Sequence, residues 1–508
     1  MSQAYPDGTR RALISTSAML SSMLVAIDTT IANVALPHIQ ATVGASQEQI
    51  VWVLTSYLIA SAIATPLSGW VATRFGRKRV MTSSIAGFVL ASLLCGLSNS
   101  LPLLVIARAI QGVSGAGLVP LSQAALLDNT PPAQHPRAMA IFGLGAMFGP
   151  LIGPTLGGYL TDALSWRWVF FVNLPLGLLA LLGLMTFMGE TKDPHPTRFD
   201  VFGFATVSIA LAAFQLVLDR GQQLDWFDSK EVVLEAVVLV VAGYYAVVHM
   251  FTGRDTFIRP ELFGDRNFAL GCVLSAIVGV VAFATLPMIT VMIQQLLGYT
   301  AFQTGLISAP RGIGTIISMF TVSQLVGKID TRYFLIAGLS LLSLGQAMYT
   351  QIDLEVSQRA LVVAGLVQGC GAGLLFVPLS TIVFATLAPR FRNEGAAIYA
   401  LTRNIGASLG ISYLQSSIIK NGARAHSRLV EWIRPDNPVL AARQPDFDFQ
   451  SPAALAQNNG LVTRQAMMLS YIDMFWFVAV LACIMIPMVI MMRTPRRQAE
   501  PVELPMFD

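Results

Sequence analysis

Asp28 stands where a carboxylate could carry chemistry, because it lies inside the unbroken apolar segment 12–35. A charge in the hydrocarbon core of a membrane is costly, and ionisable residues there usually mark the path of an ion or a substrate. Burial disfavours the charged form of a carboxyl group, which suits a group that takes up and releases a proton. The alternative is a satisfied structural contact, or a position nearer the outer surface. We interpret Asp28 as a proton-carrying residue.

Arg108 is a second charged residue inside an apolar segment, 101–126. A buried arginine stays protonated, so it acts through its charge and favours the ionised form of a carboxyl group that approaches it. This predicts a role in the release of a proton. A snorkelling or hydrogen-bonded structural arginine is the alternative.

Two further arginines, Arg311 and Arg403, also lie in apolar segments, so arginines there outnumber Asp28 three to one. If they face a central cavity, that cavity favours anionic or weakly acidic amphiphiles over dications; either could instead be a helix-packing contact. Neutral polar side chains in these segments could line the cavity or only bridge neighbouring helices: Asn33, Gln111, Gln294, Gln368, Asn404 and Gln415.

One element that must position these residues is the glycine-rich stretch GLGAMFGPLIGPTLGG at 143–158, inside an apolar segment of about 138–160. Gly149, Gly153 and Gly157 recur every four residues, which leaves one helix face without side chains. Small residues let two helix backbones approach closely in a membrane. We expect a flexible packing spine, with a plain small-residue seam as the alternative.

The composition sets the class of protein. Hydrophobic residues make up 54% of the 508 residues and charged residues only 12%, which excludes an ordinary soluble protein. Apolar runs long enough to cross a membrane recur along the chain. They predict an all-α membrane protein with fourteen spans: 12–35, 50–72, 80–98, 101–126, 138–160, 168–188, 200–218, 231–251, 269–296, 303–326, 333–350, 360–386, 395–419 and 470–492.

An even number of spans places both termini on one side. With the N-terminus in the cytoplasm, the inner segments hold 19 of the 32 lysines and arginines, and the six short outer loops hold four. Positive residues collect on the cytoplasmic side of membrane proteins. We therefore predict that both termini are cytoplasmic.

Several functions are excluded. The basic residues are too scattered to suggest a nucleic-acid partner, and the four cysteines lie in apolar segments, where they resemble small buried hydrophobes rather than metal ligands. No Walker motif, metal-ligand spacing or nucleophile elbow stands out, so we expect neither an enzyme nor a bound metal or cofactor. An ion gradient is the remaining source of energy.

An internal repeat divides the chain. Gln111 recurs as Gln368 at an offset of 257, and Gly149 and Gly153 correspond to Gly406 and Gly410. The repeat predicts a six-helix bundle at 12–188 and another at 269–492, separated by two inserted helices at 200–251. The second bundle carries a long outer loop at 420–466. Two parallel repeats place a substrate site at their interface near the membrane midplane.

Several motifs carry a resemblance to the major facilitator superfamily. The glycine stretch resembles its antiporter signature, motif C, in Gly145, Gly149, Pro150, Gly153, Gly157 and Gly158. RAIQGVSGAG, which contains Arg108 and Gln111, resembles motif B. GWVATRFGRKRV resembles motif A, a cytoplasmic latch, in Gly69, Arg74, Gly76, Arg77 and Lys78. Thr73 stands where most of the superfamily has Asp, and a positive-inside anchor explains these arginines equally well.

Within the superfamily, DTTIANVALP at 28–37, SWRWVFFVNLPLG at 165–177 and LDRGQQLDWFDS at 218–229 resemble the fourteen-helix drug:proton antiporters of the Gram-negative EmrB type. The resemblance implies proton-driven export of hydrophobic toxic compounds across the bacterial inner membrane, with a periplasmic adaptor and an outer-membrane channel as partners. A nutrient importer and a non-transporting sensor on the same scaffold are the alternatives. The antiporter glycines argue against the first, and Asp28 with Arg108 against the second.

Overall fold

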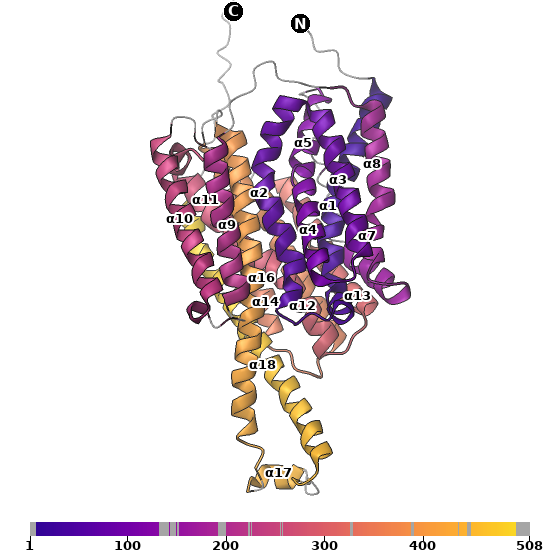
Figure 1. Cartoon of the computed structure of the whole chain (residues 1–508), viewed down its shortest axis with the longest axis vertical. Coiled ribbons are helices and arrows are strands. Elements are labelled where there is room, and N and C mark those ends of the chain that lie inside the picture. Colours follow the sequence, from indigo (N-terminus) through magenta and orange to yellow (C-terminus); the bar gives the residue numbers. More distant parts are fainter. Residues whose placement is uncertain are drawn as a thin grey trace, which may run out of the picture.

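The chain folds into a bundle of long helices, seen in a computed structural model (Figure 1). The structure describes residues 7–131, 142, 149, 152–190, 200–221, 224, 226–253, 256, 258–325, 329–387, 391–434, 436–443 and 449–493. The start of α1 (Gly8–Val43) and the end of α18 (Pro452–Met491) lie on one face of the bundle, called here the terminal face. A helical hairpin projects from the opposite face, called here the hairpin face.

The first half of the bundle is built from residues before 190. Its helices are α1, α2 (Trp52–Phe75), α3 (Arg77–Leu97), α4 (Leu101–Gly115), α5 (Leu118–Asp128), α7 (Trp168–Phe171) and α8 (Asn173–Phe187), with further helical residues at 152–163. A 3-10 turn, η1 (Gln49–Val51), leads into α2. α1 packs on α5 and α8, α2 on α4, and α3 on α4 and α8, so α4 lies between α2 and α3, and α8 between α1 and α3.

Two inserted helices, α9 (Val201–Gly221) and α10 (Lys230–Thr252), form an antiparallel pair at the side of the bundle (Figure 1). α9 contacts both α2 and α16, which belong to different halves. Gln215 of α9 donates a hydrogen bond to Ser412 of α16 at 2.8 Å. The outer surface of α10 is largely exposed and apolar, as expected for a helix that faces lipid.

The second half begins with one long element, Arg266–Leu296, that changes its winding along its length. It comprises α11 (Arg266–Val278), the π-helix η5 (Gly279–Ala284), α12 (Thr285–Val291) and the π-helix η6 (Met292–Leu296). It is followed by α13 (Ala301–Leu325), α14 (Thr331–Tyr349), α15 (Gln358–Ala385), α16 (Arg392–Val430) and α18. π turns inside α-helices are rare and frequent at functional sites.

The hairpin is formed by the far ends of α16 and α18, joined through the short helix α17 (Pro438–Arg443) (Figure 1). α16 has 39 residues and α18 has 40. At 1.5 Å per residue each is about 60 Å long, twice the roughly 30 Å of a hydrocarbon core. The segment 420–466, which we expected to be a loop, is thus largely helical because both spanning helices continue beyond the bundle.

Eleven helices of the described residues are long and apolar enough to cross a membrane. The chain is therefore an all-helical, multi-pass membrane protein. The predicted span 138–160 is described only in part, and α14 and α16 fall outside the eleven. The count of fourteen spans stays a prediction.

Candidate functional site

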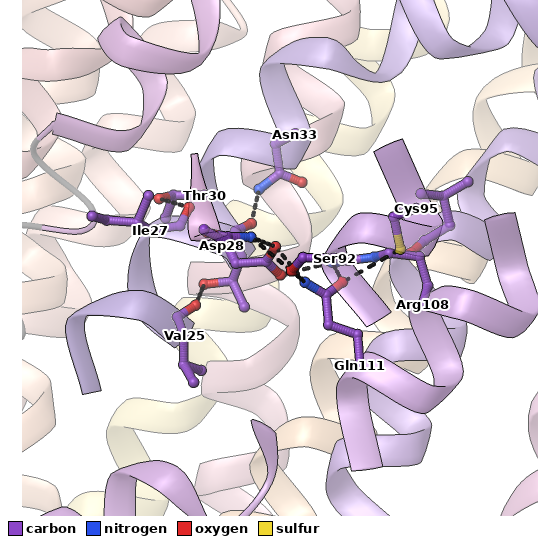
Figure 2. Close-up of polar contacts among 12 residues, drawn as sticks. Val25, Ile27, Asp28, Thr30, Asn33, Ser92, Cys95, Arg108 and Gln111 are labelled. Atoms are coloured by element: carbon purple, nitrogen blue, oxygen red, sulfur yellow. Dashed lines mark hydrogen bonds and ion pairs between the residues drawn. The ribbon is translucent and has the colours of Figure 1, made fainter. Parts of the chain in front are cut away.

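Asp28 lies at the centre of a fully buried polar cluster whose residues come from four helices (Figure 2). Its Oδ2 accepts a hydrogen bond from Arg108 Nη1 at 2.7 Å. Its Oδ1 accepts from Gln111 Nε2 at 2.8 Å and from Asn173 Nδ2 at 2.7 Å. Ser92 Oγ supports both amides, accepting from Gln111 at 2.6 Å and from Asn173 at 3.2 Å. α1, α3, α4 and α8 thus converge on one carboxylate.

The Arg108 side chain is buried, with only 1% of the residue exposed, and it has contacts on several sides. Its Nε donates to the Val53 carbonyl at 3.1 Å and its Nη1 also donates to Gln111 Oε1 at 2.6 Å. The guanidinium lies 4.4 Å from the centre of the Tyr57 ring and 5.7 Å from that of Phe170. Cation–π contacts of this kind stabilise a desolvated cation.

The cluster suits a charged Asp28. A buried ion pair is stable only when further hydrogen bonds satisfy its remaining donors and acceptors, and this pair has them. A proton on Asp28 would remove the attraction to Arg108 and leave a buried cation. Uptake of a proton therefore has to be accompanied by a rearrangement around Arg108.

We expected Gln111 to line a substrate cavity, but it belongs to this cluster, because its amide donates to Asp28 Oδ1 and is fully buried. We had not singled out Ser92 or Asn173. Asn173 had a signal: it is a polar residue inside the apolar segment 168–188. Its direction could not be deduced, since α8 presents it to α1 and α3 only through tertiary packing.

The glycines of the spine pack against the turn of α1 that carries Asp28. A Cβ at Gly149 would lie 2.5 Å from Ala26 Cβ, and one at Gly153 would lie 2.1 Å from Thr30 Oγ1. Gly157 faces the backbone of Ile31 in the same way. Gly145 and Pro150 lie outside the described residues. Gly149, Gly153 and Gly157 thus lie against α1 on both sides of Asp28.

Gly158 faces the other half of the bundle instead. A Cβ there would lie 2.3 Å from the Ala301 carbonyl oxygen at the start of α13. The partner glycine on α13, Gly305, faces the Pro154 carbonyl at the same distance. These close contacts belong to the hairpin-face side of the bundle, where the two halves also share the hydrogen bonds Gln294–Val34, Gln295–Gln40 and Phe302–Asp162.

A cavity of about 1370 Å³ lies between the halves and extends to the terminal face. Thr29 and Thr30, next to Asp28, are in its wall, together with Tyr57 and Arg108. At the terminal face its wall includes residues of the segments around Arg77, Asp200 and Arg259. The cavity therefore reaches from one face of the protein to the edge of the Asp28 cluster, while the two halves are in contact on the hairpin-face side.

Of the residues predicted to line a cavity, Asn33, Arg403 and Asn404 lie in its wall. Gln111, Arg311 and Gln368 do not. Arg311 turns into the second half and donates a hydrogen bond to the Ala282 carbonyl. Gln368 is fully buried and donates to Thr285 Oγ1 at 3.4 Å. Both side chains thus bond the long element Arg266–Leu296, Arg311 at η5 and Gln368 at α12.

The internal repeat is visible in the packing of the second half. Gly406 and Gly410 of α16 lie against the backbones of Ala276 and Val280, as Gly149 and Gly153 lie against α1. The same offset of 257 places Thr285 at the position of Asp28 and Gln368 at that of Gln111. The second half thus repeats the buried polar contact but has a hydroxyl in place of the carboxylate.

Comparison with known proteins decides the family. The model of the Major Facilitator Superfamily matches residues 18–411. The chain belongs to this superfamily. It is 31% identical over 506 residues to "Multidrug export protein EmrB" of Escherichia coli, covering 97% of this chain and 98% of that protein. It is 30% identical to "Fatty acid resistance protein FarB" of Neisseria gonorrhoeae, with 97% and 98% covered.

The fold agrees with this membership. The inward-open structure of the xylose transporter XylE from E. coli matches with a TM-score of 0.61 at 14% identity, covering 96% of this chain and 98% of that chain. A major facilitator protein is a membrane transporter and not an enzyme. The resemblance drawn from the sequence motifs is confirmed.

The major facilitator motif A lies where α2 passes into α3 at the terminal face. Gly76 has φ +97°, and a Cβ there would lie 2.1 Å from Glu190 Oε1, which accepts a hydrogen bond from Lys78 N at 3.2 Å. Arg77 forms an ion pair with Asp128 at the end of α5. Gly69 lies in the cavity wall, and the Arg74 guanidinium lies 5.3 Å from the centre of the Trp70 ring. These contacts stay within the first half, and the role of a latch stays a prediction.

Proposed function

We propose that this protein is a proton-driven antiporter that exports hydrophobic toxic compounds across a bacterial inner membrane. The observation that carries the proposal is the buried Asp28–Arg108 pair at the inner end of a large cavity between the two halves. A titratable carboxyl group inside a membrane is expensive to bury and is usually functional. The name of EmrB, a multidrug export protein, supports export of drugs, and the name of FarB, a fatty acid resistance protein, supports fatty acids as one class of toxic compound.

Coupling between proton and substrate follows because the proton site at Asp28 and the substrate cavity share residues. Arg108 touches Asp28 and also lies in the cavity wall. A substrate that enters the cavity contacts Thr29 and Thr30, the residues next to Asp28 in α1, and so acts on the same turn of helix. Proton and substrate then compete through the position of α1, with the proton gradient as the energy source and no cofactor.

Weakly acidic substrates fit the charge of the cavity. Arg403 of α16 lies in the wall and makes no ion pair among the residues that the structure describes. Asn404 of α16 and Asn33 of α1 add neutral polar groups to the same wall. A desolvated cation attracts an anion more strongly than it would in water. A carboxylate substrate would supply the missing charge.

The direction of transport rests on the topology predicted from the charges. If the terminal face is cytoplasmic, the cavity is open to the cytoplasm and the hairpin projects into the periplasm. The hairpin is then available to a periplasmic adaptor that leads to an outer-membrane channel, as the resemblance to EmrB-type pumps implies.

The test is transport in inverted membrane vesicles with an imposed pH gradient and a fluorescent hydrophobic dye. Asp28→Asn keeps the size of the side chain and removes titration, so we expect no dye gradient when transport is normalised to the amount of protein in the membrane. A variant that still builds a dye gradient from a pH gradient would contradict proton coupling through Asp28. In inverted vesicles an exporter accumulates dye inside the vesicles. Dye movement out of the vesicles by the unmodified protein would favour an importer, and the absence of dye movement in either direction would favour a sensor.

A further inference from the structure

Asn173, the first residue of α8, carries a buried amide that uses only one of its two polar atoms. Its Nδ2 donates to Asp28 Oδ1 and Ser92 Oγ. Its Oδ1 is buried and has no hydrogen-bond donor among the described residues. Buried amide oxygens are usually paired, and an unpaired one destabilises the fold. An open acceptor beside a proton-carrying carboxylate therefore needs an explanation.

Asp28 is surrounded by donors. Arg108, Gln111 and Asn173 each direct an N–H group at one of its two oxygens. This environment suits the charged carboxylate, which only accepts hydrogen bonds. A neutral carboxyl group also donates one, and its new hydrogen would point at the hydrogens already there. Proton uptake therefore requires an acceptor close to Asp28.

Two other acceptors, which bond the donors around Asp28, are already used. Gln111 Oε1 accepts from Arg108 Nη1 at 2.6 Å and lies 3.7 Å from Cys95 Sγ. Ser92 Oγ accepts from both amides. Asn173 Oδ1 has no donor in the part of the chain that the structure describes. A half-turn of the terminal amide torsion, which has a broad two-fold profile, exchanges Oδ1 with Nδ2 at nearly the same place.

We propose that Asn173 is a positioning residue of the proton site whose amide changes direction with the charge of Asp28. Its Nδ2 donates to the charged carboxylate, and its Oδ1 accepts the hydrogen bond of the neutral carboxyl group. One proton binds from solution and no other covalent bond changes. The inference rests on the proposed function in taking Asp28 as the group that titrates. Arg108 of α4, Tyr57 of α2 and Cys95 of α3 are the other charged or titratable groups that face it.

Infrared difference spectroscopy on the full-length protein in lipid tests the proposal. The C=O stretch of neutral Asp28 is identified as the band that appears at low pH and is lost in Asp28→Asn. In Asn173→Leu the neutral carboxyl group has lost its acceptor, so we expect this band at higher frequency. Because a net hydrogen bond is worth about a factor of ten, we also expect dye export by Asn173→Leu to fall about tenfold.

Thr186→Val is the matched control, since Thr186 lies on α8 but is exposed and bonds only its own helix; its band should not move. Asn173→Ala repeats the test without adding bulk if Asn173→Leu does not fold. An unchanged band in both Asn173 variants would overturn the proposal. A shifted titration midpoint with an unchanged band would also overturn it, because Asn173 would then only donate. The band is read without substrate, so a protein that titrates at Asp28 yet exports nothing contradicts the proposed function alone.

Discussion

At the scale of the residue, the central feature is a buried ion pair between Asp28 and Arg108. The pair is tolerated in a membrane because further hydrogen bonds satisfy both charged groups. Asp28 receives three hydrogen bonds, and Arg108 is satisfied by a carbonyl, an amide and an aromatic face. The interior offers little screening, so removal of either charge leaves the other one exposed to a low-dielectric environment.

A second substitution that removes the other charge of the pair should therefore restore stability but not transport. Arg108→Gln leaves a buried carboxylate and should destabilise the protein by about 3–5 kcal/mol. Adding Asp28→Asn removes that orphan charge and should restore most of the loss, while neither the single nor the double variant exports dye. Thermal unfolding in detergent and vesicle transport measure the two effects. Additive losses of stability would mean that the two side chains do not form a pair in the membrane.

The two other membrane arginines should behave differently from each other. Arg403 lies in the cavity wall, whereas Arg311 bonds the Ala282 carbonyl inside the second half. Arg403→Gln should reduce export of an acidic uncoupler by about tenfold, the worth of one charge-assisted contact, and spare a cationic dye. Arg311→Gln is the matched control and should affect both compounds alike. Equal losses for both compounds in Arg403→Gln would exclude it from substrate choice.

The sequence was sufficient to find Asp28 and Arg108, because a charge inside an apolar run stands out by itself. It was not sufficient for Ser92 and Asn173, whose importance comes only from the meeting of α3 and α8 with α1. Arg311 shows the same limit from the other side. The sequence placed Arg311 in an apolar segment. The face of the helix that it occupies depends on how α13 packs on its neighbours, which the sequence does not show.

At the scale of the element, glycines decide how close the helices come. Gly149, Gly153 and Gly157 lie directly against α1, and Gly406 and Gly410 bring α16 against η5 and α11. The four-residue spacing predicted such a face from the sequence alone. The helix that it would contact could not be predicted, since spacing fixes a face and not its partner.

A methyl group on this face should therefore be felt at the proton site. Gly153→Ala places a Cβ 2.1 Å from Thr30 Oγ1, next to the Asp28 turn, and overpacking of this kind destabilises by about 1–3 kcal/mol. We expect a lower unfolding temperature and slower export. Gly243→Ala on α10 is the control, because a Cβ there has open space. Identical behaviour of the two variants would show that the spine tolerates side chains.

At the scale of the whole molecule, the two halves meet at the hairpin face and part towards the terminal face. The hydrogen bonds Gln294–Val34, Gln295–Gln40 and Phe302–Asp162 join them on one side, and the cavity separates them towards the other. Hydropathy predicted the bundle well. It did not predict the hairpin, because the helical segments beyond the bundle are polar and carry no membrane signal.

Shortening the hairpin gives a test of its role in assembly. His426 of α16 and Asn459 of α18 lie side by side, with 2.9 Å between His426 Nε2 and Asn459 Oδ1. Replacing the residues between them by four glycines should close the shortened hairpin, since a four-residue link spans about 12 Å. The contact of Ser470 Oγ with the Ile418 carbonyl at 2.6 Å, nearer the bundle, remains. If the hairpin docks a periplasmic adaptor, the shortened protein should still move dye in inverted vesicles, while resistance of intact cells falls towards that of cells without the pump. Loss of vesicle transport would instead make the hairpin part of the transport machinery, and unchanged resistance would remove it from the adaptor interface.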